Sequence, residues 1–360
     1  MKKIFTLFFA LVATTTLWAE DFSVNGIYYN ILTDKTNEVE VTYGSSKYTG
    51  SVAIPTTVAH NGTTYSVTSV GRQAFHGCSQ VTSVAIPTSV KTIGDGAFNS
   101  CSGLTSMLIP KSVESIGEWA FYSCKGLVSI TIPNSVTSAE KGAFAYCSGL
   151  TSIAISNSLT NIGEMMFQNC TSLASITIPN SVKSIGNNAF EKCISLTSVV
   201  IPNSVTTIGN QAFYNCVGLN SISIGNSVNS IGGGAFNGCS GLTSVTIPNS
   251  IESIGDWAFY SCSLLKEVIC YAEEIPATGA GVFASTPQSK ATLYVPDTAL
   301  EAYKTAEQWK DFGTILSIQE IENGVENTYS PSANTQKIFR DGQLILIRDG
   351  VEYNAMGAEL

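Results

Sequence analysis

The chain repeats one short pattern, with a fixed period, over most of its length. Nine cysteines stand 23 positions apart, and a phenylalanine precedes each of them by three positions. The cysteines are Cys78, Cys101, Cys124, Cys147, Cys170, Cys193, Cys216, Cys239 and Cys262, and the phenylalanines are Phe75, Phe98, Phe121, Phe144, Phe167, Phe190, Phe213, Phe236 and Phe259. A fixed period of this length predicts a solenoid, in which each unit is stable only when it packs against its neighbours.

Each unit contains two kinds of apolar spacing. In the copy that begins at Leu242, Val245 and Ile247 alternate with polar residues, which predicts a short strand with one buried face. A proline ends this strand because it has no N–H to donate to a ladder. Phe259 and Cys262 then follow at the spacing of one helical turn. When the units stack, side chains of the same type would therefore pack on one another in continuous columns that exclude water.

The N-terminus has the pattern of a signal peptide over residues 1–19. Lys2 and Lys3 precede an apolar stretch that ends in the small residue Ala19. This stretch is too short for a permanent membrane anchor, and the sequence contains no other candidate transmembrane span. The sequence thus predicts an exported protein.

The two ends of the repeat array need caps, because a terminal unit would otherwise expose its apolar side. Residues 20–51 contain two alternating segments, 27–32 and 38–43, and are predicted to form an N-terminal β cap. The solenoid itself is predicted over residues 52–291, with regular repeats at 81–264.

The C-terminal cap is predicted over residues 292–321, as a strand followed by a helix from about residue 298 to residue 310. Thr298 and Glu301 have the spacing of a capping box at the start of that helix. Residues 322–336 have the composition of a linker, and residues 337–360 are predicted to form a C-terminal β tail. Two Asp-Gly pairs bracket a strand in this tail.

The cysteine column is predicted to consist of free, buried thiols, although cysteines in an exported chain commonly form disulfides. Stacked turns would hold neighbouring Cβ atoms about 5 Å apart, whereas a disulfide requires about 3.8 Å. No Cys-x-x-Cys pair occurs, so no metal site is predicted. The histidines are His60 and His76, and the geometry of the turn is expected to direct His76 outward, away from Cys78.

The sequence contains no motif for catalysis or for binding a cofactor, and we predict that the protein is not an enzyme. Charged residues make up only 12% of the chain, and the net charge is −9. A basic patch for nucleic acid is therefore absent from the sequence.

The repeat resembles that of the BspA-like leucine-rich-repeat family of bacterial surface proteins. The resemblance rests on three segments, Leu-x-x-Val/Ile-x-Ile-Pro, Ser-Val-x-x-Ile-Gly and Ala-Phe-x-x-Cys, and covers about residues 22–318. It implies an α/β repeat solenoid that is curved and right-handed, with parallel β-strands on the concave face, short helical turns opposite, and a cap at each end. The resemblance also implies that the protein is secreted or held at the cell surface, on the exterior of the outer membrane. Members of the family are linked to adhesion to host extracellular-matrix proteins and to other bacteria.

The tail also resembles the C-terminal sorting signal of the type IX secretion route of Bacteroidetes. The similarity lies in a run of strand residues followed by Gly350, Tyr353, Met356 and Gly357. The alternative is a final hairpin with no role in sorting.

Two sets of residues are candidate partner-binding surfaces. Variable aromatic residues beside the Phe-x-x-Cys turn form the first set, which contains Trp119, Tyr122, Tyr146, Tyr214, Trp257 and Tyr260. The second is an outward strip on the predicted concave face, which contains Ser106, Ser129, Ser152, Ser175, Ser198, Ser221 and Ser244. The aromatic residues are either an adhesive patch or scattered packing on neighbouring turns.

Two classes of function remain open at this stage. The first is an adhesin or protein-binding solenoid whose protein partners are host extracellular-matrix proteins or other bacterial surfaces. A repetitive face suits it, because many weak contacts add up through avidity. The second is a structural spacer or self-associating scaffold of the cell surface, which exposed strand edges would favour.

Overall fold

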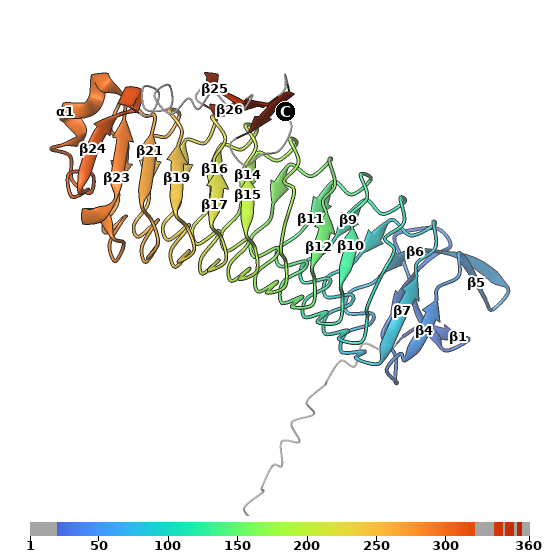
Figure 1. The fold of residues 1–360 in the computed structure, drawn as a ribbon. Coiled ribbons are helices and arrows are strands. Elements are labelled where there is room, and N and C mark those ends of the chain that lie inside the picture. The colour runs from blue at the N-terminus through green and yellow to red at the C-terminus, as the bar shows by residue number, and fades with distance from the viewer. Residues whose placement is uncertain (1–19, 321–334, 341–342, 349–350, 355–360) are drawn as a thin grey trace, which may run out of the picture.

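The structure is a computed structural model that describes residues 20–320, 335–340, 343–348 and 351–354. The predicted signal peptide and most of the predicted linker lie outside the described residues. The chain forms an elongated stack of about 11 turns, and each turn lies beside the one before it (Figure 1). The prediction of a leucine-rich-repeat solenoid with parallel strands is confirmed.

One side of every turn is an extended segment, and these segments together form a surface that we call the strand face. The strand face contains β4 (Gly50–Ala53), β7 (Val81–Ala85), β10 (Ser129–Thr131), β12 (Ser152–Ala154), β15 (Ser198–Val200), β17 (Ser221–Ser223), β19 (Ser244–Ile247), β21 (Glu267–Cys270), β23 (Thr292–Val295) and β24 (Thr314–Ser317). Neighbouring strands pair in parallel with a register of one repeat, as between Ser129 and Ser152. Alternate side chains therefore point into the core, as the sequence pattern predicts.

A second set of parallel strands, which the sequence analysis missed, follows the proline corners and forms two sheets along the stack. Most of its strands are only two residues long, as for β8 and β9, and we call this surface the narrow face. It contains β6 (Thr63–Val70), β8 (Thr92–Ile93), β9 (Ser115–Ile116), β11 (Ser138–Ala139), β13 (Asn161–Ile162), β14 (Ser184–Ile185), β16 (Thr207–Ile208), β18 (Ser230–Ile231), β20 (Ser253–Ile254) and β22 (Ala277–Thr278). Its isoleucines, such as Ile254, are buried.

The third side of each turn corrects the prediction of short helical turns. Its backbone N–H groups alternate between two kinds of partner. The N–H of Phe190 donates to the carbonyl of Ala212 in the next turn at 2.7 Å, whereas the N–H of Cys193 donates within its own turn to Phe190 at 3.1 Å. Asn188 and Lys192 both have a φ of 57°, in the left-handed region. Two left-handed residues per turn interrupt any helix, and the result is a ladder of hydrogen-bonded turns, which we call the turn ladder.

The phenylalanines form one continuous column inside the stack. All nine repeat phenylalanines are 0% exposed, and neighbouring rings stack with centroids 5.0–6.0 Å apart and interplanar angles of 2–20°. Tyr48 packs on the first ring at 4.5 Å, and Phe283 continues the column beyond the last. Trp309 and Phe312 then meet Phe283 edge-on. Aromatic residues thus cover both ends of the column.

The cysteines form a second column beside the phenylalanines. All ten cysteines are buried and are free thiols, so the predicted burial is confirmed. They are more than apolar fillers, because each Sγ from Cys101 onward in the ladder donates to the carbonyl of a phenylalanine one turn back, over 3.0–3.3 Å. Cys270 in β21 lies 3.3 Å from the hydroxyl of Tyr303.

The chain before the first repeat forms two hairpins. β1 (Phe22–Val24), β2 (Ile27–Ile31) and β3 (Glu38–Thr42) pair as antiparallel neighbours, and β3 then pairs in parallel with β6. The two strands predicted in this segment are therefore confirmed. β5 (Thr57–His60) pairs antiparallel with β6, ahead of the regular repeats.

The helix predicted from about residue 298 to residue 310 is mostly absent. The structure has 3-10 turns η1 (Gln288–Lys290) and η2 (Asp297–Ala299) and the four-residue helix α1 (Leu300–Tyr303). The predicted capping box is wrong, because Ala299 is the N-cap residue and makes no side-chain cap, while Glu301 pairs with Lys304 at 2.7 Å. A shorter helix lets the chain bend so that both Tyr303 and Trp309 are buried.

The tail contains β25 (Thr335–Arg340), β26 (Gln343–Arg348) and β27 (Val351–Asn354), which pair as antiparallel neighbours. β26 is the strand predicted between the two Asp-Gly pairs. β25 begins at Thr335, inside the segment predicted as linker.

Candidate binding surface

Three of the six candidate aromatic residues come together on the turn ladder. The rings of Trp119 and Tyr122 meet edge-on with centroids 5.5 Å apart, and Tyr122 lies 5.1 Å from Tyr146 of the next turn. Trp119 and Tyr122 are half-buried and Tyr146 is 38% exposed. We call these three residues the aromatic cluster.

The backbone conformation and a glycine shape the aromatic cluster. Trp119 and Tyr146 occupy left-handed positions, with φ of 55° and 61°. A large side chain in this region is uncommon and costs about 1–3 kcal/mol. Gly142 lies under the indole of Trp119, since a Cβ there would lie only 2.1 Å from Cζ3 of the ring. The indole can therefore lie against the next turn.

The other three candidates stay apart. No ring contact joins Tyr214, Trp257 or Tyr260 to another aromatic side chain in the part of the chain that the structure describes. Trp257 is 53% exposed, and Gly281 lies beneath its indole much as Gly142 lies beneath that of Trp119. The structure therefore divides the predicted set into one cluster and three separate residues.

The predicted serine strip follows the strand face. Ser106, Ser129, Ser152 and Ser175 are exposed, while Ser198, Ser221 and Ser244 are half-buried. Paired strands place the serines side by side, as for Ser198 and Ser221. Short hydroxyls on a flat sheet provide no large anchor of the kind that dominates protein interfaces.

The outward rows of the strand face continue beyond the last regular repeat, and the sequence analysis missed this extension. Strand pairing aligns Thr246 with Ile269, Tyr294 and Leu316 in one row. The neighbouring row places Glu267 beside Ser244. The signal was hidden because the chain between β21 and β23 is longer than one regular repeat, which puts their paired residues out of step with the period. Aligning the residues strand by strand, rather than by the 23-residue period, would have shown that the outward rows continue.

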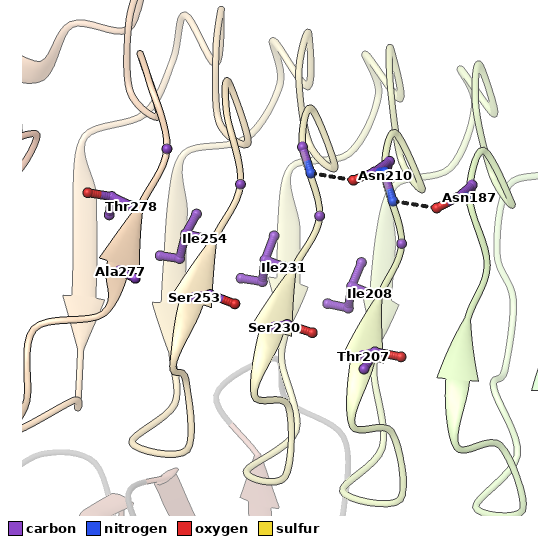
Figure 2. A pocket seen from close by; sticks show the side chains of 15 residues that line it. Asn187, Thr207, Ile208, Asn210, Ser230, Ile231, Ser253, Ile254, Ala277 and Thr278 are labelled. Carbon is purple, nitrogen blue, oxygen red and sulfur yellow. Dashed lines mark hydrogen bonds between the residues drawn. The ribbon is translucent and has the colours of Figure 1, made fainter.

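A shallow groove of about 580 Å³ runs along the narrow face (Figure 2). Asn187 accepts the N–H of Asn210 through Oδ1 at 2.8 Å, and Asn210 accepts the N–H of Gly233 at 2.7 Å, so both amides bridge neighbouring turns. Isoleucines such as Ile231 point into the core beside it. The groove is built of structural hydrogen bonds and small residues.

The acidic, thiol and imidazole side chains form no metal centre in the part of the chain described above. Across residues 20–320 and the tail strands, no group of three or more His, Cys, Asp or Glu side chains is placed to hold a metal ion. His60 stacks on Phe22 at 4.1 Å. No helix within the same residues has the length and apolar character needed to cross a bilayer.

Fold and surface together define a leucine-rich-repeat protein, a class of repeat scaffolds that generally bind other proteins. The profile described as "BspA type leucine rich repeat region" matches in 6 copies over residues 68–197 and 183–306. The chain therefore belongs to the BspA-type leucine-rich-repeat family, and the comparisons indicate no catalytic family.

Several solved structures are similar to this chain. The pneumococcal vaccine antigen PcpA is 21% identical, with a TM-score of 0.51, and the match covers 78% of this chain and 82% of that one. A leucine-rich-repeat protein from Bacteroides ovatus is 25% identical, with a TM-score of 0.37 and coverage of 82% and 99%. A leucine-rich-repeat protein of T. pallidum is 28% identical, with a TM-score of 0.44 and coverage of 60% and 87%. No curated protein matches the sequence.

Proposed function

We propose that this protein is an exported, non-enzymatic adhesin that binds protein partners at the bacterial surface. Its partners would be host extracellular-matrix proteins or the surfaces of other bacteria. The signal-peptide pattern of residues 1–19 and the sorting-signal resemblance of residues 337–360 support export. Membership of a repeat family that binds proteins supports a binding role rather than catalysis.

The observation that carries the proposal is the aromatic cluster. Tyrosine and tryptophan are enriched among the residues that dominate binding energy at protein interfaces. Trp119, Tyr122 and Tyr146 form such a group at the surface, and two of them occupy backbone positions where large side chains are locally unfavourable. The backbone conformation does not favour large aromatic residues at these two positions, which supports a role in partner binding. In this proposal the solenoid is a curved, right-handed coil whose concave side is the strand face, and the aromatic cluster lies away from it.

Removing the aromatic cluster should weaken binding at least ten-fold. The variant Trp119→Gln, Tyr122→Asn, Tyr146→Asn replaces each residue with one that another turn carries at the same position, namely Gln211, Asn237 and Asn215. The backbone should tolerate these changes, while loss of a hot spot costs about 2 kcal/mol or more, which is more than ten-fold in affinity. Binding to purified matrix proteins and to whole bacterial cells measures the effect.

Tyr214→Asn is the matched control, since it removes a separate aromatic residue at the position equivalent to Tyr122. The control should bind like the wild type, and both variants should keep the wild-type melting temperature. Equal binding by the cluster variant and the wild type would exclude the aromatic cluster as the anchor.

A self-associating surface scaffold is the second candidate, and two strand edges favour it. Among the residues that the structure describes, β4 and β24 each pair on one side only, so the strand face has an unpaired edge at each end. Unpaired edges of parallel sheets are templates for addition of a further strand. If this function is correct, sedimentation of the purified protein will show larger species as concentration rises. A single monomeric species at every concentration would favour the adhesin.

A further inference from the structure

The last four strands of the strand face differ chemically from the rest of that face. β19, β21, β23 and β24 form one four-stranded parallel sheet at the end of the stack (Figure 1). Over the regular repeats the outward rows hold mainly Ser, Thr and Ala. On the last strands one row instead runs from Thr246 through Ile269 and Tyr294 to Leu316. At the usual spacing of neighbouring strands, this row is about 14 Å long.

One carboxylate of the strand face itself, that of Glu267, lies beside this apolar row. Glu267 occupies the neighbouring outward row, paired with Ser244 on one side and Thr292 on the other. No lysine, arginine, aspartate or other glutamate stands at the outward strand positions of β4 to β24. Glu267 is half-buried, and no ion pair or hydrogen bond joins its carboxylate to another side chain among residues 20–320. Lys266 precedes it in the chain but does not pair with it.

The surroundings make this carboxylate less stable as an anion than an exposed one. Burial raises the pKa of Glu267 above its ordinary value. Tyr294 lies close by: its pKa is raised by burial and then by the charges of Glu267 and Glu320. The carboxylates of Glu267 and Glu320 therefore both act on the Tyr294 hydroxyl, while apolar Ile269 and Leu316 lie on the neighbouring strands. A cation bound here would compensate the charge of Glu267 and would contact the face of the Tyr294 ring.

We propose that the end of the strand face formed by Glu267, Ile269, Tyr294 and Leu316 is a docking site for a protein segment that presents one arginine or lysine between apolar side chains. The carboxylate of Glu267 takes the cationic group, and the apolar row takes the flanking side chains. Arginine and tyrosine are both enriched in binding hot spots, and an unpaired carboxylate supplies the charge complementarity. This site is separate from the aromatic cluster and does not depend on it.

Two blocked peptides test the proposal on the full chain, one with the core Leu-Arg-Leu and one with Leu-Gln-Leu. We expect the arginine peptide to bind wild-type protein at least five-fold more tightly than the glutamine peptide. Glu267→Gln keeps the shape of the side chain but removes its charge, so it should abolish that preference. Ile269→Thr, which gives β21 the residue that Thr246 provides in β19, should weaken binding of both peptides.

Glu252→Gln is the matched control, because it removes an exposed carboxylate in the preceding turn, outside the strand face. It should leave the preference for arginine unchanged. Equal binding of the two peptides by wild type, or an unchanged preference in Glu267→Gln, would overturn the proposal. The variant that lacks the aromatic cluster should bind the arginine peptide normally, so failure of the adhesin proposal would be seen separately.

Discussion

Phe190→Ala should destabilise the protein by about 3–5 kcal/mol. The ring of Phe190 is 0% exposed and stacks between Phe167, at 5.4 Å, and Phe213, at 5.0 Å. Truncation leaves a cavity in the middle of the column. The neighbouring turns cannot collapse into it freely, because the N–H of Phe190 is tied to Ala212 and the rest of the turn ladder is bonded in the same way. The loss should therefore fall in the upper part of the range for buried aromatic residues.

Thermal and urea unfolding measure this loss, which should lower the melting temperature by several degrees. Hydrogen exchange should also speed up in the turns that contain Phe167 and Phe213, since each unit depends on its neighbours. Val200→Ala is the control: Val200 is 48% exposed on the strand face, and its truncation should change stability by less than about 0.5 kcal/mol. If Phe190→Ala lowers the melting temperature by less than one degree, the stacked phenylalanine column does not stabilise the fold as inferred.

The columns were predictable from the sequence because the repeat determines them directly. Side chains that recur once in every unit must occupy equivalent places if the units stack, and the apolar ones among them, such as Phe190 and Cys193, are then expected to fill the core. The strands that precede each proline were predictable for the same reason, since Val245 and Ile247 show an alternation of apolar and polar positions. At these positions the alternation of apolar and polar residues and the 23-residue period lead to the same prediction.

The turn ladder was not predictable in the same way. The spacing of Ala, Phe and Cys suits one helical turn, but it suits two successive hydrogen-bonded turns equally well. The residues with a left-handed backbone conformation decide between a helical turn and two hydrogen-bonded turns. At positions such as Gln211 and Asn215 these residues are not glycine, so the sequence gives no sign of that conformation. The narrow face was missed because strands as short as β20 have too few residues to show any alternation.

The candidate surfaces depended on contacts between turns that the repeat does not encode. Tyr146 lies one position further along its unit than Tyr122 does in the unit before, and the two rings meet only because of the backbone at Tyr146. Glu267 and Tyr294 lie where the repeat length changes. At the aromatic cluster and at the end of the strand face, the residues suited to binding stand where the sequence departs from the 23-residue period. The period itself predicts only the scaffold.

High pH should unfold the protein, because the thiols of the cysteine column are buried. Burial raises the pKa of Cys101, Cys216 and Cys262 from 9.0 to about 12, and that of Cys270 to about 11. Below pH 9 these thiols are protonated in both the folded and the unfolded chain, so their contribution to stability is fully present. Above pH 9 the unfolded chain releases protons that the folded chain keeps. The free energy of unfolding therefore falls as pH rises through the window from 9 to 12.

The size of the effect follows from the number of thiols. Each contributes a loss of about 1.4 kcal/mol per pH unit inside the window, so the four named cysteines account for roughly 5 kcal/mol by pH 10. Burial raises the pKa of Cys193 and Cys239 in the same direction. Since folded proteins are stable by only about 5–15 kcal/mol, we expect unfolding between about pH 10 and pH 11.

Circular dichroism and the ultraviolet absorbance of thiolate, recorded together in a reducing buffer, test this prediction. Both signals should change at the same pH, because thiolates form only as the chain unfolds. Tyrosines add to the effect, since burial also raises the pKa of Tyr29 to about 12. Cys216→Ala separates the two contributions. The pH dependence of the free energy of unfolding, measured in urea, gives the number of protons released on unfolding, and this variant should lower that number by up to one. Thiolate absorbance that rises near pH 9 while the circular dichroism of the fold is intact would show that the cysteine column is open to solvent, and the dry interior inferred from the repeat would then be wrong.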